Sequence, residues 1–217
     1  MANCIANHRI IRNFAAAKRN VTMNRKSFTP EQLSELEKMM SGELYAASAN
    51  STLLDLLAEC HERCFDYNQL RPSQVAERTA LMRQMLGHTG ERFKIISPFM
   101  CDYGFNISIG EDFFANTGLV ILDEAPVTFG QRVFIAPSCA FYTAGHPLDE
   151  AQRQAGKQYS LPIVVGDNVW IGGHVCVMPG VTIGNDVVIG AGSVVTRDIP
   201  DGYLAMGNPC RPVRRIK

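Results

Sequence analysis

Residues 165–200 read VGDNVW IGGHVC VMPGVT IGNDVV IGAGSV VTRDIP, six hexapeptides that follow one another without a remainder. The first position is a branched aliphatic residue in all six: Val165, Ile171, Val177, Ile183, Ile189 and Val195. The fifth position is small or branched throughout, and glycine occupies the second position in four of the six. Such a period is typical of a parallel β-helix, in which each hexapeptide supplies one short strand and one turn. The stretch therefore predicts a mainly β fold with aliphatic residues stacked inside its coils.

The same phase recurs upstream of this stretch. Residues 109–126 read IGEDFF, ANTGLV and ILDEAP, and residues 129–140 read FGQRVF and IAPSCA after a shift of two residues. Two segments break the period: a polar insertion of 20 residues at 143–162, and the proline- and arginine-bearing end at 201–217. We expect a β-helix over 91–200. The insertion should protrude from it as a loop, where function tends to be placed, and the end should cap the last coil.

The chain ahead of the repeats divides into two parts. Residues 30–90 carry apolar side chains at helical spacing, such as Leu33, Leu36 and Met40, and are predicted to form a small helical subdomain. Residues 1–29 carry six basic and no acidic side chains. An acid-free basic start is typical of a transit peptide or of a poorly ordered leader. We expect a disordered leader, because no cleavage signal follows.

The composition argues against nucleic-acid binders, membrane proteins and disulfide-rich proteins. The 217 residues carry 21 basic and 21 acidic side chains, so the formal net charge is zero. This balance argues against a nucleic-acid or membrane-surface binder, which needs an electrostatic field of one sign. No apolar run approaches the roughly 20 residues of a membrane-spanning helix. Seven cysteines, an odd number scattered along the chain, do not resemble a disulfide framework. We expect a soluble cytoplasmic protein with no nucleic-acid or membrane partner.

The chemistry-bearing residues are few. The sequence contains neither a phosphate loop nor a nucleophile elbow. Cys60 and Cys64 stand one helical turn apart and could clip a metal, but no second ligand pair lies nearby, so we interpret them as packed helix cysteines and predict no metal. His61 and His88 are expected to be solvated, and His174 occupies an outward-facing corner of the repeat. His146 differs from these histidines because it opens the long insertion.

Five segments of the chain resemble the maltose and galactoside O-acetyltransferases, over roughly residues 33–216. They are MSGELY (40–45), CDYGFNI (101–107), YTAGHPLD (142–149), NVWIG (168–172) and GNP (207–209). The resemblance implies a left-handed parallel β-helix, assembled as a homotrimer with active sites between subunits. It also implies acetyl-CoA as the co-substrate and a sugar hydroxyl as the acceptor.

The resemblance also implies a role for individual residues. His146 would be the general base of a direct transfer, since a neutral imidazole suits proton abstraction at neutral pH. The acceptor residues would be Asp102, Asn116 and Glu124. The acetyl-CoA residues would be Trp170, Gly173, Ala191, Thr196, Arg197, Arg211 and Arg214. Two positions depart from the family pattern, with Glu124 where aspartate is common and Ala47 where an acidic residue is common. These departures leave the identity of the sugar open.

Plainer interpretations remain open for the same residues. Asp102 and Glu124 could serve only as turn residues at coil corners, Asn116 as part of an inward asparagine ladder, and the C-terminal arginines as a solvated tail. Another hexapeptide acyltransferase would use a non-sugar acceptor such as serine or an antibiotic. A zinc carbonic anhydrase of the γ type needs three histidines, and the repeat region holds His146 and His174 alone. A purely structural β-helix is the non-enzyme alternative.

Overall fold

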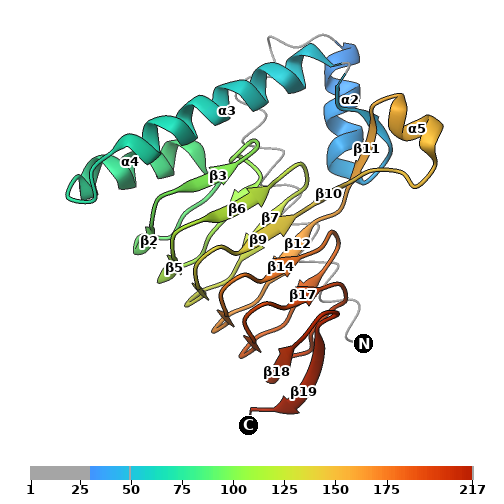
Figure 1. The fold of residues 1–217 in the computed structure, drawn as a ribbon. Helices are drawn as coiled ribbons and strands as arrows, with labels where there is room; N and C mark the ends of the chain where they lie inside the picture. Colours follow the sequence, from blue (N-terminus) through green and yellow to red (C-terminus); the bar gives the residue numbers. More distant parts are fainter. Residues whose placement is uncertain (1–29, 49, 217) are drawn as a thin grey trace.

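The protein, described here by a computed structural model over residues 30–48 and 50–216, is built around the predicted parallel β-helix (Figure 1). The predicted leader at 1–29 lies outside the described residues. The chain runs through three sheets in turn, and the strands of each sheet pair in parallel except for the last strand, β19. We number these sheets in chain order and name the corners between them accordingly.

Sheet 1 contains the strands β2 (Phe93–Ile95), β5 (Phe113–Ala115), β8 (Phe134–Ile135), β13 (Trp170–Ile171), β16 (Val188–Ile189), β18 (Tyr203–Met206) and β19 (Arg211–Arg215). Sheet 2 contains β3 (Phe99–Cys101), β6 (Leu119–Leu122), β9 (Ala140–Tyr142), β14 (Cys176–Val177) and β17 (Val194–Val195). Sheet 3 contains β4 (Ile107–Ser108), β7 (Val127–Phe129), β12 (Ile163–Val165) and β15 (Thr182–Ile183).

The hexapeptide phase predicts the interior correctly. Each of the six first-position residues from Val165 to Val195 is at most 1% exposed. The fifth-position residues from Val169 to Ile199 are at most 2% exposed. The fourth position turns the chain: Asn168, His174, Gly180, Asp186 and Gly192 all have φ between 54° and 80°. Asparagine, aspartate and glycine tolerate this left-handed backbone best, which explains their recurrence at the corners.

The ends of the β-helix are covered by different elements. At the first coil, α3 (Ser51–Gln69) lies against β3, and α4 (Val75–Met85) packs beside α3. Tyr67 of α3 meets Phe99 of β3 edge to face, with ring centroids 6.4 Å apart. At the last coil, β19 turns back antiparallel to β18. The helices at one end and β19 at the other each cover an end of the β-helix that would otherwise expose unpaired strand edges.

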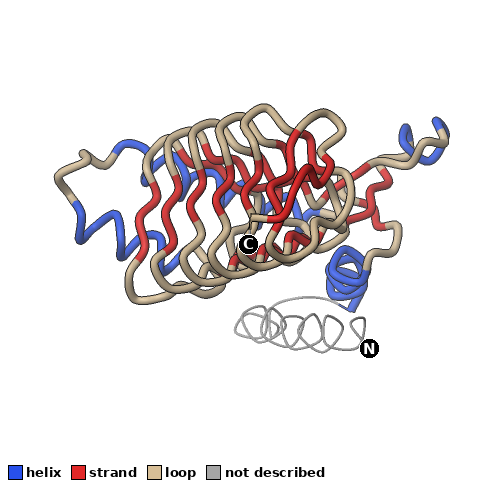
Figure 2. The backbone as a smooth tube through the Cα atoms, turned by 90° about the horizontal axis from the view of Figure 1, so that it is seen from below, coloured by secondary structure: helices blue, strands red, loops and turns tan. Residues whose placement is uncertain are grey.

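The insertion at 143–162 leaves the β-helix at its side and pairs with the N-terminal part of the chain (Figure 2). It contains β10 (Ala144–Gly145), α5 (Glu150–Gln154) and β11 (Lys157–Ser160). The strand β1 (Tyr45–Ala46), which follows α2 (Pro30–Ser41), pairs antiparallel with β11. Beneath them a separate apolar cluster includes Leu36, Met39, Tyr45 and Tyr103. The helix α2 thus shares this cluster both with β1, which pairs with the insertion, and with Tyr103 of the first coil.

Within the described residues, none of the helices combines the length and the apolar character needed to cross a membrane.

Candidate active site

The predicted site residues gather at two corners of the prism. Corner 2–3, where sheet 2 passes into sheet 3, carries Asp102, Glu124 and the insertion with His146, and in the last coils Thr196 and Arg197. Corner 1–2 carries Asn116, Gly173 and Ala191. Trp170 lies on sheet 1, and Arg211 and Arg214 lie on β19. One chain therefore brings His146 to the same corner as two of the three acceptor residues, and leaves Asn116 at another.

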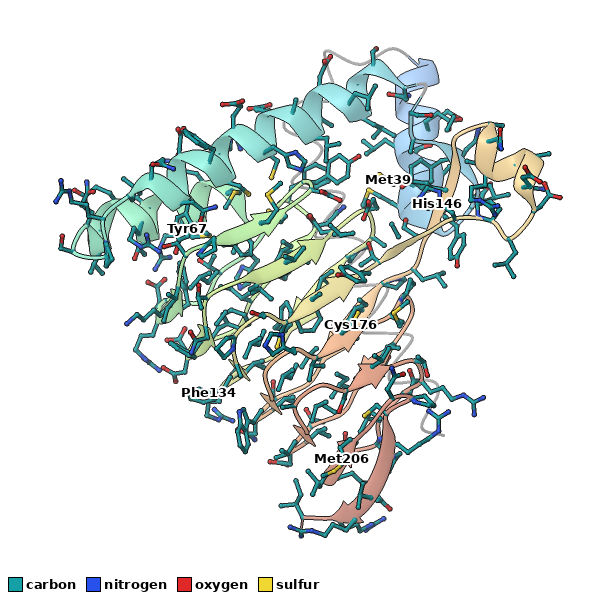
Figure 3. The ribbon with its side chains drawn as sticks, in the orientation of Figure 1. Met39, Tyr67, Phe134, His146, Cys176 and Met206 are labelled. Atoms are coloured by element: carbon teal, nitrogen blue, oxygen red, sulfur yellow. The ribbon has the colours of Figure 1, made fainter. Side chains whose placement is uncertain are left out.

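His146 directly follows β10 and is exposed at the side of the β-helix (Figure 3). Its Nδ1 lies 3.4 Å from the carbonyl oxygen of Lys157 on β11. A carbonyl oxygen can only accept a hydrogen bond, so this contact favours the tautomer with the proton on Nδ1. The lone pair then resides on Nε2, which lies 3.4 Å from the Nε2 amide of Gln158. Both ring nitrogens thus contact residues of β11, and Nε2 is the acceptor nitrogen.

Tyr45 contacts Gln158, the residue that lies beside His146. Its hydroxyl donates to the Oε1 of Gln158, 2.9 Å away, and Gln158 in turn contacts His146. Tyr45 is fully buried, and burial together with the nearby charge of Glu124 raises its pKa far above the usual range. Tyr45 therefore stays a neutral donor. The sequence did not predict the contact between Tyr45 and Gln158, because their strands pair across more than 100 residues of chain.

Three carboxyl groups lie together at corner 2–3. The Oδ1 of Asp123 accepts hydrogen bonds from the backbone N–H groups of Asp102 and Tyr103, at 3.0 and 2.9 Å. The Oε2 of Glu124 lies 3.3 Å from the hydroxyl of Thr143, the residue that begins the insertion. Asp102 is more accessible, with 15% of its side chain exposed. Asp102 and Glu124 therefore lie at the same corner, and Glu124 is the more buried of the two.

Burial and mutual repulsion raise the pKa of two of these carboxyl groups. Burial, reinforced by the charge of Asp102, raises the pKa of Glu124 to about 8. Burial raises the pKa of Asp123 to about 7, although the backbone donor Tyr103 opposes the shift. At neutral pH Glu124 is thus chiefly a neutral acid, able to donate a hydrogen bond.

The raised pKa of Glu124 predicts that stability falls as pH rises. Between about pH 4.5 and pH 8 the folded protein keeps a proton that the unfolded chain has lost. The free energy of unfolding should therefore decrease through this window, by up to about 1.4 kcal/mol per pH unit from this group. Glu124→Gln removes the titration while keeping the shape of the side chain. Urea unfolding at several pH values should show a shallower slope for this variant.

Glu62→Gln, at an exposed position of α3, serves as the matched control and should keep the wild-type slope. An unchanged slope in Glu124→Gln would contradict the protonated state of Glu124.

His61 corrects one expectation from the sequence. Rather than being simply solvated, it is partly buried, and its Nε2 lies 3.2 Å from the Oδ1 of Asp102. The residue reaches Asp102 because α3 lies across the end of β3. His61 therefore holds the carboxylate of Asp102 in place, and it belongs to the site. His88 and His174 are exposed, as expected.

Asn116 does not form part of an inward ladder. It is half-buried, and its Oδ1 accepts a hydrogen bond from the backbone N–H of Thr117 at 2.8 Å. Gly173 lies two coils further on and Ala191 three, at the same corner, where the N–H of Gly192 donates to the carbonyl of Gly173 at 2.8 Å. The two residues give this part of corner 1–2 little side-chain bulk.

The remaining predicted donor residues are exposed. Trp170 is 56% exposed on sheet 1, and Thr196, Arg197, Arg211 and Arg214 are all exposed at or near the C-terminal coils. Among the described residues Arg197 has no side-chain hydrogen-bond or ion-pair partner, whereas Arg211 donates to the carbonyl of its neighbour Cys210 at 2.7 Å. Within one chain these residues lie in three places: on sheet 1, at corner 2–3, and on the hairpin formed by β18 and β19.

The described residues contain one group of three potential metal ligands, and it consists of cysteines. The three-histidine arrangement of a γ-type carbonic anhydrase is not assembled within the described part of one chain. The cysteine group was missed from the sequence, because its third member, Cys101, lies 37 residues beyond Cys64.

The chain is similar to known proteins over most of its length. The maltose acetyltransferase hexapeptide capping motif matches residues 38–90, and the six-repeat bacterial transferase hexapeptide motif matches residues 162–197. A putative acetyltransferase of Saccharomyces cerevisiae is 49% identical over 181 residues, which is 83% of this chain and 92% of the yeast protein.

Two solved structures share the fold. A maltose O-acetyltransferase from Clostridium difficile 630 superposes with a TM-score of 0.83 at 43% identity, covering 84% of this chain and 97% of that one. A galactoside acetyltransferase in complex with coenzyme A superposes with a TM-score of 0.81 at 40% identity, covering 84% of this chain and 91% of that one.

Proposed function

The chain belongs to the hexapeptide-repeat acetyltransferases that carry the maltose acetyltransferase capping motif, and from this premise we propose that it transfers an acetyl group from acetyl-CoA to a sugar hydroxyl. The observation that carries the proposal is the placement of His146. The ring is oriented by the Lys157 carbonyl and stands at the same corner as the acidic residues Asp102 and Glu124.

The proposed reaction is a direct transfer. The Nε2 of His146 accepts the proton of the sugar hydroxyl as its oxygen attacks the carbonyl carbon of the thioester. A carbon–oxygen bond forms, the tetrahedral intermediate collapses, and the carbon–sulfur bond breaks. The imidazolium then returns its proton to the departing thiolate of coenzyme A. No covalent acyl-enzyme is needed, because a thiolate is a good leaving group.

The acceptor side would be formed by Asp102 and Glu124, with Asn116 completing it. A sugar hydroxyl both donates and accepts hydrogen bonds, so it is matched by a mixed set of groups. Asp102, held by His61, offers an acceptor, and protonated Glu124 offers a donor. The longer side chain of Glu124 and the small side chain of Ala47 would set which sugar fits.

The split of the residues between two corners supports a site shared between chains. Corner 1–2 holds Asn116 with Gly173 and Ala191, while corner 2–3 holds His146 with Thr196 and Arg197. We propose a homotrimer in which corner 1–2 of one chain faces corner 2–3 of its neighbour. The pantetheine arm of acetyl-CoA would lie along Gly173 and Ala191. Trp170 and the guanidinium groups of Arg197, Arg211 and Arg214 would hold the nucleotide end, where arginine suits phosphate.

A thiol-release assay tests the acceptor class. The full chain is incubated with acetyl-CoA and, separately, with maltose, glucose, a β-galactoside, serine and chloramphenicol. We expect release of free coenzyme A above the hydrolysis background with at least one of the sugars, and an O-acetyl sugar by NMR. Release with serine or chloramphenicol alone would assign the protein to a non-sugar branch. If no acceptor causes release of coenzyme A and the protein does not bind acetyl-CoA, the purely structural β-helix would be favoured.

A further inference from the structure

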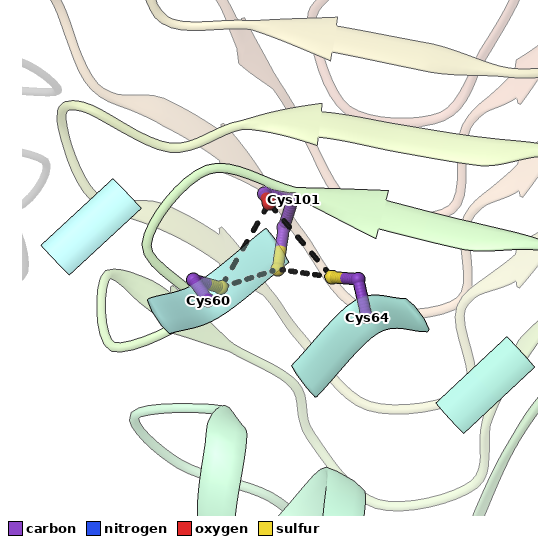
Figure 4. Close-up of side chains that lie close together, drawn as sticks. All are labelled: Cys60, Cys64 and Cys101. Carbon is purple, nitrogen blue, oxygen red and sulfur yellow. Dashed lines mark hydrogen bonds between the residues drawn. The ribbon is translucent and has the colours of Figure 1, made fainter. Parts of the chain in front are cut away.

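Three thiols meet beneath helix α3 (Figure 4). Cys60 and Cys64 lie one turn apart on the face of α3 that covers the first coil, and Cys101 ends the strand β3 opposite them. Cys60 is 4% exposed, Cys64 1% and Cys101 0%. The three side chains come from two elements that pack directly on each other, so their arrangement is fixed by the fold.

The spacing of the sulfur atoms fits a single metal ion. The Sγ of Cys101 lies 3.5 Å from that of Cys60 and 3.8 Å from that of Cys64, and all three lie within 4.8 Å of one another. Metal–thiolate bonds of about 2.3 Å place sulfur ligands roughly 3.8–4.0 Å apart around one ion. The observed separations are close to these values without any rearrangement of the backbone.

The ligand set selects a soft metal. The group contains no carboxylate or imidazole, and the next polarizable atom is the thioether sulfur of Met85, 3.8 Å from the Sγ of Cys64. Thiolate and thioether ligands select Cu(I) over harder ions, whereas structural zinc sites require four nitrogen or sulfur ligands of the thiolate and imidazole kind. The three thiols are also buried from solvent, which suits a three-coordinate ion that needs no water ligand.

We propose that Cys60, Cys64 and Cys101 bind one Cu(I) ion per chain, with the thioether of Met85 beside it. Binding displaces thiol protons to solvent as the thiolates take the metal. Since all three thiols are buried, the ion is acquired during folding or through a local opening of α3. The inference is independent of the acetyl-transfer proposal, because it involves none of the residues assigned to that reaction.

The test uses the full chain, reduced and kept anaerobic, with Cys4→Ser as the background so that the thiol outside the described residues does not contribute. Cu(I) is supplied as its complex with bathocuproine disulfonate, and the copper retained per chain is measured after desalting. We expect one equivalent to be retained and the Tm to rise, because a ligand that binds the folded state stabilises it. Cys64→Ala should lose the copper and the rise in Tm.

Cys176→Ser is the matched control, since Cys176 is a half-buried thiol on β14, remote from the group, and it should retain the copper. X-ray absorption on the loaded parent protein should show three sulfur neighbours, a result that does not depend on how any variant folds. The proposal is overturned by copper retention in Cys64→Ala, by nitrogen or oxygen neighbours, or by retention of Zn(II) where Cu(I) is released to the chelator.

Discussion

Replacing His146 with alanine is expected to lower kcat for acetyl transfer by about 10²–10⁴-fold, the usual contribution of a positioned general base. The KM for acetyl-CoA should stay close to wild type, because the ring binds neither the phosphates nor the pantetheine arm in the proposed arrangement. Steady-state kinetics at saturating sugar, with thiol release as the signal, measure both quantities. The fold should be unaffected, since His146 is exposed and contributes no core contact.

The matched control is His88→Ala, because His88 is also an exposed histidine and none of the proposed roles involves it. Its kcat should change little. Wild-type kcat in His146→Ala would remove the general-base assignment and, with it, the main support for the mechanism.

Phe141→Ala is expected to reduce the free energy of unfolding by about 3–5 kcal/mol. Phe141 is fully buried on β9, and its ring meets that of Phe129 edge to face at 5.0 Å between centroids. Phe129 in turn contacts Phe113, at 5.2 Å, so the substitution opens a cavity at one end of a run of three packed aromatic rings. Urea unfolding at one fixed protein concentration gives the difference, which should appear in the midpoint rather than in the slope.

Phe65→Ala provides the comparison, because the side chain of Phe65 is 59% exposed on α3. The same chemical change there should cost no more than about 0.5 kcal/mol, as for most surface substitutions. Equal losses at the two positions would mean that Phe141 does not pack inside the prism as described.

The β-helix is predictable from the sequence because one local rule is repeated. Every coil buries the same positions, so a branched residue such as Ile183 and a turn residue such as Asp186 recur with the period of the fold. Strand neighbours are then fixed by stacking alone. The placement of α3 across the end of β3 is not periodic, and the contacts it creates have no counterpart in the repeat.

The candidate site is predictable only in part for the same reason. His146 stands out because it opens the segment that breaks the period, and Asp102 and Glu124 follow from the resemblance to a family. The contact of His61 with Asp102 joins residues 41 positions apart on different elements, and the contact of Tyr45 with Gln158 spans 113. Such contacts depend on how a helix and a loop pack, which spacing along one sequence does not encode.

The pairing of β1 with β11 has a further consequence. Through this pairing, the position of the backbone around His146 depends on α2 and β1. The hydroxyl of Ser160 donates to the carbonyl of Met39, and Tyr45 is opposite Gln158. Because this lateral assembly has its own apolar cluster, its amide protons should exchange as one cooperative foldon, at a lower opening energy than the coils. Activity would then be lost at a lower temperature than the one at which the β-helix unfolds.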